Sequence, residues 1–329
     1  MMGLQRFQYL LVVITLTAVL IPRGTAISVS HEFSQNEHLY QKYTQQNDFA
    51  LFALTRNGVI KITPTGSKQT IISPKNAGGI EIVNDEIYLN NYSHSGDIFV
   101  YDMTGSYVRT IPVPSQASSS SNFVMIPDGR IALLDPYDDK IYFLDASGNL
   151  LTTTNIQDSP DSHFQNLDGV VVGPQLIVSE DGDKHLLAFD LSTYQRSIFK
   201  DLSSLPDSWL GAITYANGAY FLTTPVSIYR IPDVGSATKI GEIPASNITG
   251  LAVINNFAYV SVNFSGEIYK VNLFGGFSSV FTSGLDYPED LEATFNAIAH
   301  DSNLRYLPLA LKDFDSASQF HVLYKSLVP

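Results

Sequence analysis

The sequence predicts an all-β protein, a six-bladed β-propeller with four antiparallel strands in each blade. Three observations predict this fold. A seven-residue pattern recurs six times along the 329 residues, apolar residues alternate within each copy, and residues typical of tight turns separate the copies. A repeat of this length and composition is typical of four-stranded sheets arranged around a ring.

The repeated pattern sets the number of blades. Its copies begin at residues 57, 96, 139, 184, 226 and 266, about 42 residues apart on average. In the copy "GDIFVYD" at 96–102, Ile98 and Val100 share one face, whereas Phe99 and Tyr101 share the other. The alternation indicates a strand, and two apolar faces indicate that neighbouring sheets cover it from both sides.

One complete unit, residues 121–156, shows the strands that belong to a blade. The predicted strands are 123–126, 130–134, 140–144 and 150–155. They are joined by "PDG", "DPYDD" and "DASGN", which consist largely of residues that tolerate or pre-set turn dihedral angles. Nothing in this unit has helical spacing, so each blade is expected to be a four-stranded antiparallel sheet.

The two ends of the repeat region are expected to close the ring. The first unit begins near residue 48 without an inner strand, and "LDYPEDLEATF" at 285–295 is typical of a lone inner strand. This C-terminal strand is therefore predicted to complete the first blade, which removes exposed sheet edges. The propeller then spans 48–295, after a lead-in at 27–47. The tail, 296–329, is expected to pack on the propeller, and a seventh blade built from it is the alternative.

The N-terminus is typical of a secretory signal peptide. Arg6 precedes an apolar run of about 13 residues, which is shorter than the roughly 20 residues that span a bilayer, and small residues end at Ala26. We expect cleavage near Ala26, secretion and no stable membrane anchor; a retained anchor is the alternative. Three N-x-S/T sequons predict a glycoprotein with acceptors at Asn91, Asn247 and Asn263.

Composition excludes several classes of function. The chain has 19 basic and 32 acidic residues, and removal of the leader leaves 17 basic residues and a net charge of −15. Such a protein repels phosphate backbones, so nucleic acid is not an expected partner. The chain has no cysteine, which excludes disulfides and thiolate metal sites. No nucleophile elbow, zinc-protease motif or phosphate-binding loop is present, and nothing specifies an oligomeric state.

Two segments carry a resemblance to known propellers. "GRIALLDPYDDKIYFLDASGNLL" at 129–151 and, more loosely, "GPQLIVSEDGDKHLLAFDL" at 173–191 resemble blades of the NHL-repeat and SMP-30/gluconolactonase-like families. The resemblance covers about 48–295. It implies, for the lactonases, a divalent metal held in the central channel by an early glutamate and later Asn and Asp residues.

The expected "E-G-P"-like string with the early glutamate is not found at the first inner strand. Asn122, Asp168 and Asp290 stand at the starts of inner strands and could bind Ca²⁺ or Mg²⁺. The alternative is that they only cap the strand entrances. The prediction is therefore no cofactor and no metal ligand, with Ca²⁺ reserved for a lactonase.

Loops expected around the channel mouth contain aromatic and polar residues, which suit a small and largely apolar molecule. The candidate catalytic residues are His163, Trp209, Tyr287 and Asp290. The candidate substrate-binding residues are Tyr92, His94, Asn122, Tyr137, Phe164 and Asp168. Alternatively, Trp209 only fills a gap between blades and the histidines are solvated.

Three functions follow. The first is a secreted enzyme of secondary metabolism that performs a metal-independent cyclisation. The leader, the sequons and the fold resemble those of secreted fungal hetero-Diels–Alder enzymes, and this resemblance implies catalysis by proximity and by hydrogen-bond donors. The second is a metal-dependent lactonase or related hydrolase. The third is a non-enzymatic extracellular binding protein of the NHL type.

Overall fold

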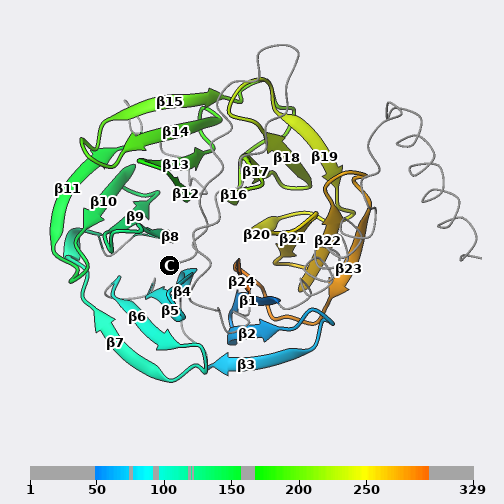
Figure 1. Ribbon diagram of the computed structural model, residues 1–329, viewed down its shortest axis with the longest axis horizontal. Coiled ribbons are helices and arrows are strands. Elements are labelled where there is room, and N and C mark those ends of the chain that lie inside the picture. The colour runs from blue at the N-terminus through cyan, green and yellow to red at the C-terminus, as the bar shows by residue number, and fades with distance from the viewer. Residues whose placement is uncertain are drawn as a thin grey trace, which may run out of the picture. The chain divides into compact units, whose positions relative to one another are not determined.

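The computed structural model describes residues 49–73, 77–91, 96–117, 120, 122–156 and 167–295. The predicted leader, the lead-in and the tail at 296–329 lie outside the described residues. The described chain forms six four-stranded antiparallel sheets arranged as a ring, which confirms the predicted six-bladed propeller (Figure 1). Among the described residues, no helix is long and apolar enough to cross a membrane.

The strands of each blade follow one another from the hub to the rim. Blade 1 contains β24 (Asp290–Phe295), β1 (Phe49–Thr55), β2 (Gly58–Ile62) and β3 (Lys68–Ile72). Blade 2 contains β4 (Ala77–Val83), β5 (Glu86–Asn91), β6 (Ile98–Asp102) and β7 (Tyr107–Ile111). Blade 3 contains β8 (Asn122–Met125), β9 (Ile131–Asp135), β10 (Lys140–Leu144) and β11 (Leu150–Asn155). A short 3₁₀ helix, η1 (Ser115–Ala117), precedes it.

The other three blades have the same order from hub to rim. Blade 4 contains β12 (Asp168–Val172), β13 (Gln175–Glu180), β14 (His185–Asp190) and β15 (Arg196–Asp201). Blade 5 contains β16 (Ile213–Ala216), β17 (Ala219–Thr223), β18 (Ser227–Ile231) and β19 (Thr238–Glu242). Blade 6 contains β20 (Ile248–Ile254), β21 (Phe257–Val262), β22 (Glu267–Asn272) and β23 (Ser278–Thr282). The six copies of the repeated pattern form the third strands.

Apolar contacts between neighbouring blades form the core. Phe143 and Leu134 of blade 3, for example, pack with Leu176 and Phe189 of blade 4, and all four are fully buried. Burial on both faces explains why the middle of each of these strands is apolar on both faces. The core is thus a ring of contacts between sheets, which leaves the hub to the inner strands.

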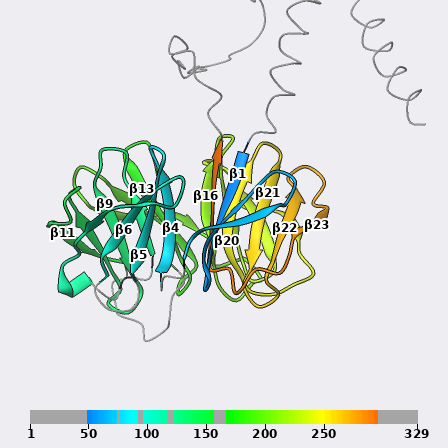
Figure 2. The same ribbon diagram turned by 90° about the horizontal axis from the view of Figure 1, so that it is seen from below.

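The predicted closure of the ring is also confirmed. β24 pairs antiparallel with β1, with Leu54 opposite Asp290 and Leu51 opposite Ala293 (Figure 2). Because every blade repeats the same antiparallel order, the inner strands run in the same direction. Their first residues therefore gather at one end of the central channel.

Candidate active site in the hub channel

Asn122, Asp168 and Asp290 begin inner strands and meet at one level of the channel. Asn122 Nδ2 donates to Asp168 Oδ1 (3.0 Å), and Asp168 Oδ2 accepts from the amide of Ile213 (2.8 Å) in blade 5. Asp290 Oδ2 accepts from the amide of Ile80 (3.0 Å) in blade 2. The capping role expected as the alternative is therefore present, and it links one blade to the next.

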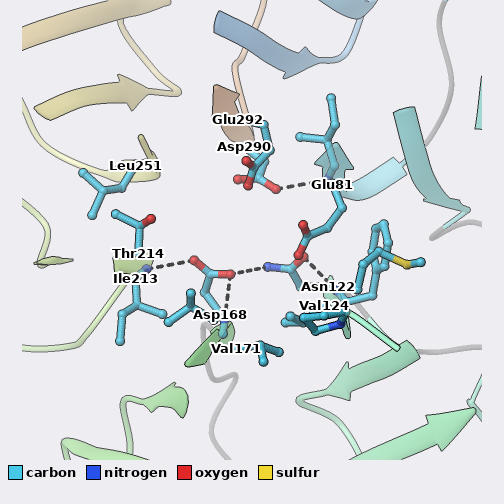
Figure 3. A pocket seen from close by; sticks show the side chains of 16 residues that line it. Glu81, Asn122, Val124, Asp168, Val171, Ile213, Thr214, Leu251, Asp290 and Glu292 are labelled. Carbon is cyan, nitrogen blue, oxygen red and sulfur yellow. Dashed lines mark hydrogen bonds between the residues drawn. The ribbon is translucent and has the colours of Figure 1, made fainter. Parts of the chain in front are cut away.

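A second level of carboxylates lies two residues further along the inner strands. Side chains alternate along a strand, so Glu292 shares the channel face with Asp290, and Glu81 shares it with Gly79. Glu81, Glu292, Asn122, Asp168 and Asp290 all line a cavity of about 250 Å³ in the hub (Figure 3). Four carboxylates and one amide thus face the same space.

Sequence reasoning missed Glu81 and Glu292. The search for an early glutamate looked for an "E-G-P"-like string, whereas Glu81 reaches the channel from the middle of β4. The string itself is absent, but Glu81 brings an early glutamate to the channel without it. Every second residue of an inner strand faces the channel, as Asp290 and Glu292 do in "DLE". Applying this alternation to each inner strand would have identified both residues.

The four hub carboxyl groups are buried, and burial disfavours their charged forms. Burial raises the pKa of Asp168 to about 6, against hydrogen bonds from Ile213, Gly169 and Asn122 that lower it. Burial, followed by the charge of Asp168, raises the pKa of Asp290 to about 7. Burial and the neighbouring carboxylates also raise the pKa values of Glu81 and Glu292 well above the usual range.

The described residues that line this cavity include no lysine, arginine or histidine. Four like charges in one buried cluster repel one another strongly, because the low dielectric of the protein interior screens them poorly. The cluster must therefore hold protons or a cation from solution.

A second cavity, of about 220 Å³, shares Asn122, Asp168 and Asp290 with the first. Its further wall includes Trp209, Asn247, Asn263 and Glu289. The structure therefore places Trp209 in the lining of a cavity that Asp290 also lines. Trp209 precedes β16 in the link between blades 4 and 5, and it is half-buried.

The sequon residues Asn247 and Asn263 hydrogen-bond to each other in this wall. Asn263 is only 7% exposed, so a glycan on its side chain would have to displace this pair. Asn91 is partly exposed at the end of β5. Glycosylation stays a prediction, and the geometry favours Asn91 over Asn263.

Two of the remaining candidates, both described tyrosines, do not line the two cavities. Tyr137 is 50% exposed in the turn between β9 and β10. Tyr287 lies 3.7 Å beneath the Arg56 guanidinium and packs edge-on against Phe264. Neither tyrosine is among the residues that line these cavities. Tyr92, His94, His163 and Phe164 lie outside the described residues.

No protein-family model matches the sequence, and no curated protein matches it. Solved structures match its fold. A chain of a nidogen/laminin complex has a TM-score of 0.60 at 11% identity and covers 74% of this chain and 98% of its own. A putative 6-phosphogluconolactonase from Bacteroides fragilis has a TM-score of 0.54 at 11% identity, covering 76% and 99%.

A catalytically inactive virginiamycin B lyase from Staphylococcus aureus, solved with quinupristin, has a TM-score of 0.51 at 16% identity, covering 74% and 78%. At such low identity, these similarities show only that the chain has a six-bladed β-propeller fold. Two of these three proteins are named as enzymes, so the fold is compatible with catalysis. The resemblance to fungal hetero-Diels–Alder enzymes finds no support among them.

Proposed function

We propose that the hub channel binds a divalent cation and that the protein uses it to hydrolyse a small cyclic ester or a related acyl compound. The observation that supports this is the meeting of four carboxylates and the Asn122 amide in one cavity, with no basic side chain among its described lining residues. The proposal takes the second of the three functions that the sequence suggests.

The donor set fits a hard cation. Carboxylate and amide oxygens are the ligands that Ca²⁺ and Mg²⁺ prefer. Asp168 and Asp290 are oriented by the amides of Ile213 and Ile80, and each oxygen that accepts one hydrogen bond retains a second lone pair. The cation would draw its ligands from the residues that line the cavity: Asp168, Asp290, Asn122, Glu81 and Glu292. Side-chain rotations would have to bring these ligands together, because no three of the described hub carboxylates present oxygen atoms within 4.8 Å of one another.

A bound cation would supply Lewis-acid polarisation of the substrate carbonyl. The chain would supply orientation and proton transfer. Water adds to the carbonyl carbon while one glutamate at the lower level, Glu81 or Glu292, takes its proton. The ring C–O bond then breaks, and the leaving oxygen receives a proton from a carboxylic acid of the cluster. Trp209 and Asn247 would bind the rest of the substrate.

A largely apolar substrate is less favoured by the described residues. Its binding would desolvate the channel carboxylates without giving them partners, which is costly. Of the proposed aromatic residues that the structure describes, Tyr137, Trp209 and Tyr287, only Trp209 lines either cavity. The cyclisation hypothesis thus keeps Trp209 as an aromatic contact. Its other cavity-lining candidates are the same polar groups that a cation would use, namely Asn122, Asp168 and Asp290.

Isothermal titration calorimetry tests cation binding. The full-length protein is first freed of metal with a chelator and then titrated with CaCl₂, MgCl₂ or MnCl₂. We expect one bound ion in the wild type and at least tenfold weaker binding in Glu81→Gln. Asp85→Asn is the matched control, because Asp85 is an exposed carboxylate in the turn that follows the same strand. Equal affinity in all three proteins would reject the hub site.

Hydrolysis of a panel of five- and six-membered lactones, measured by pH-stat, tests the reaction. We expect turnover of at least one lactone that disappears on chelation, returns with the ion and is lost in Glu81→Gln. Turnover that persists in the chelated protein, or no turnover of any lactone by the ion-loaded protein, would refute the proposed hydrolysis.

A further inference from the structure

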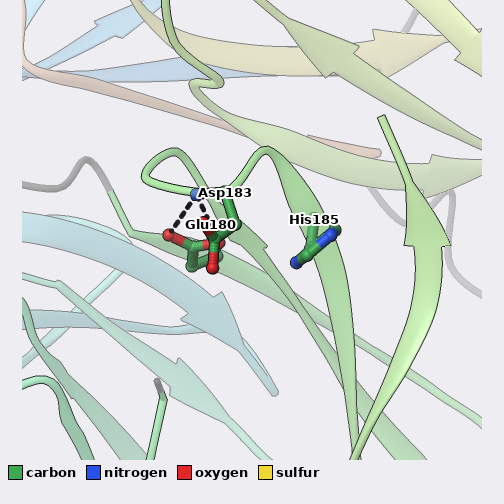
Figure 4. A group of neighbouring side chains, drawn as sticks. All are labelled: Glu180, Asp183 and His185. Carbon is green, nitrogen blue, oxygen red and sulfur yellow. Dashed lines mark hydrogen bonds between the residues drawn. The ribbon is translucent and has the colours of Figure 1, made fainter. Parts of the chain in front are cut away.

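The hairpin between β13 and β14 gathers a separate set of metal-binding side chains. Glu180 ends β13, His185 begins β14 directly opposite it, and Asp183 lies in the four-residue turn between them. One ligand atom from each residue lies within 4.8 Å of the others (Figure 4). Two ligands at ~2.1 Å from a tetrahedral zinc ion are themselves about 3.4 Å apart, so small side-chain rotations would close the set.

Two of the three side chains are already oriented. Glu180 is 1% exposed, and its Oε1 accepts from the amides of Gly182 (2.6 Å) and Asp183 (3.2 Å). His185 has a side chain that is 19% exposed, and its Nε2 lies 3.9 Å from Asp201 Oδ1 of β15. Metal-bound imidazoles and carboxylates usually have such supporting partners. Asp183 is exposed, so its carboxylate can turn toward the other two.

Blade 3 has a turn of the same length at the equivalent place, with carboxylates at two of the three corresponding positions and a lysine at the third. Asp135, Asp138 and Lys140 stand where blade 4 has Glu180, Asp183 and His185. Asp135 Oδ1 accepts from the amides of Tyr137 and Asp138, as Glu180 does from Gly182 and Asp183. The last turn residue has a left-handed φ in both blades, 51° at Asp139 and 56° at Lys184.

The two turns differ in the side chain that can carry a positive charge. In blade 3 the ammonium of Lys140 lies 3.9 Å from Asp138 Oδ2, so the turn carries its own positive charge. In blade 4 an imidazole replaces that ammonium while both carboxylates are kept. The neighbouring Lys184 directs its Nζ away from the set, to the carbonyl oxygens of Leu205 and Asp207.

We propose that Glu180, Asp183 and His185 form a binding site for a divalent transition metal of the zinc class. An imidazole with two carboxylates suits Zn²⁺, Co²⁺ or Ni²⁺ better than Ca²⁺, which prefers oxygen ligands alone. Asp201 is placed either to accept the ring N–H or to serve as a fourth ligand. The site is independent of the hub cation, because no residue is common to the two.

Cobalt binding to the chelated full chain tests the site, with visible absorption of Co²⁺ and displacement by ZnCl₂ as readouts. We expect one Co²⁺ per chain at this site, counted by its visible absorption and replaced by one Zn²⁺, in addition to any ion that the hub holds. His185→Lys, which installs the arrangement of blade 3, should keep the melting temperature and weaken Co²⁺ binding by at least about tenfold. Asp183→Asn is a second variant, at an exposed position where folding is not at risk.

Glu81→Gln separates this site from the hub and should leave Co²⁺ absorption unchanged. The proposal is overturned if the wild type binds no Co²⁺, or if His185→Lys and Asp183→Asn both bind it as tightly as the wild type. Loss of the signal in Glu81→Gln alone would assign the transition metal to the hub and would equally overturn it.

Discussion

At Gly79 the backbone of β4 passes very close to a side chain of the next blade. A Cβ atom there would lie 2.1 Å from Asn122 Oδ1. Asn122 is fixed at this point, because its Nδ2 donates to Asp168 and its Oδ1 accepts from the amide of Phe123. Glycine at position 79 therefore leaves the space that the side-chain amide of Asn122 occupies in the hub cluster.

Gly79→Ala should destabilise the protein by about 1–3 kcal/mol, because the added methyl group has to push Asn122 out of both hydrogen bonds. Urea unfolding measures the change. Gly275→Ala is the control, since its Cβ would meet only the ring of Phe277, which is 82% exposed and can turn away. Two variants of equal stability would show that the hub is not crowded at Gly79.

At the scale of the strand, the described polar side chains at the hub join four of the six pairs of neighbouring blades. Asp290 links blade 1 to blade 2, Asn122 links blade 3 to blade 4, and Asp168 links blade 4 to blade 5. Thr249 Oγ1 donates to the carbonyl oxygen of Pro288 (2.8 Å) and so joins blade 6 to blade 1. The seam of the ring thus has polar links on both sides.

Asp290→Ala should lower the free energy of unfolding by about 1–3 kcal/mol at pH 5, because the backbone amides of Ile80 and Leu291 lose their hydrogen-bond acceptor. At pH 5 the loss is not masked by relief of charge repulsion, since the pKa of Asp290 is raised to about 7. Hydrogen exchange should accelerate at these two amides. Asp290→Asn keeps one acceptor oxygen and should have a smaller effect; equal exchange in all three proteins would contradict the link.

The strands show what could be predicted from sequence and what could not. Blade number, strand order and closure by 285–295 followed from periodicity, because alternation directly reflects burial on two faces. Asp168 and Asp290 were found because they open inner strands. Glu81 was missed because its environment depends on the neighbouring inner strands, which no local pattern specifies. Tyr287 was expected at the channel mouth; it packs against Arg56 and lines neither cavity, and such tertiary contacts of a loop side chain are not specified by a local pattern.

At the scale of the whole molecule, the hub carboxylates should control how stability depends on pH. A carboxyl group whose pKa is higher in the folded protein than in the unfolded chain binds its proton more tightly when folded. It therefore stabilises the fold at low pH, and this contribution is lost as the pH rises through the folded pKa. The raised values of about 6 for Asp168 and about 7 for Asp290 place the loss between roughly pH 4 and pH 7.

Surface carboxylates act in a different pH range. The pKa of Asp190 is lowered to about 2, first by the hydroxyl of Ser192, and hydrogen bonds from Asn149 likewise lower the pKa of Asp145. Their contributions are present above about pH 4 and are lost only as the pH falls below it. Between pH 4 and pH 7 the hub cluster therefore dominates, and the metal-free protein should become less stable as the pH rises.

Thermal unfolding of the chelated protein between pH 4.5 and pH 8, converted to free energies of unfolding, tests this dependence. We expect a fall of a few kcal/mol in the free energy of unfolding, and a smaller fall in Glu292→Gln, which leaves one fewer carboxylate in the cluster. Adding the hub cation at pH 8 should restore much of the loss, whereas at pH 4.5 protons already occupy the cluster and the ion should have little effect. Stability that rises steadily from pH 4.5 to pH 8 without a metal would mean that these four carboxylates do not share one enclosed channel.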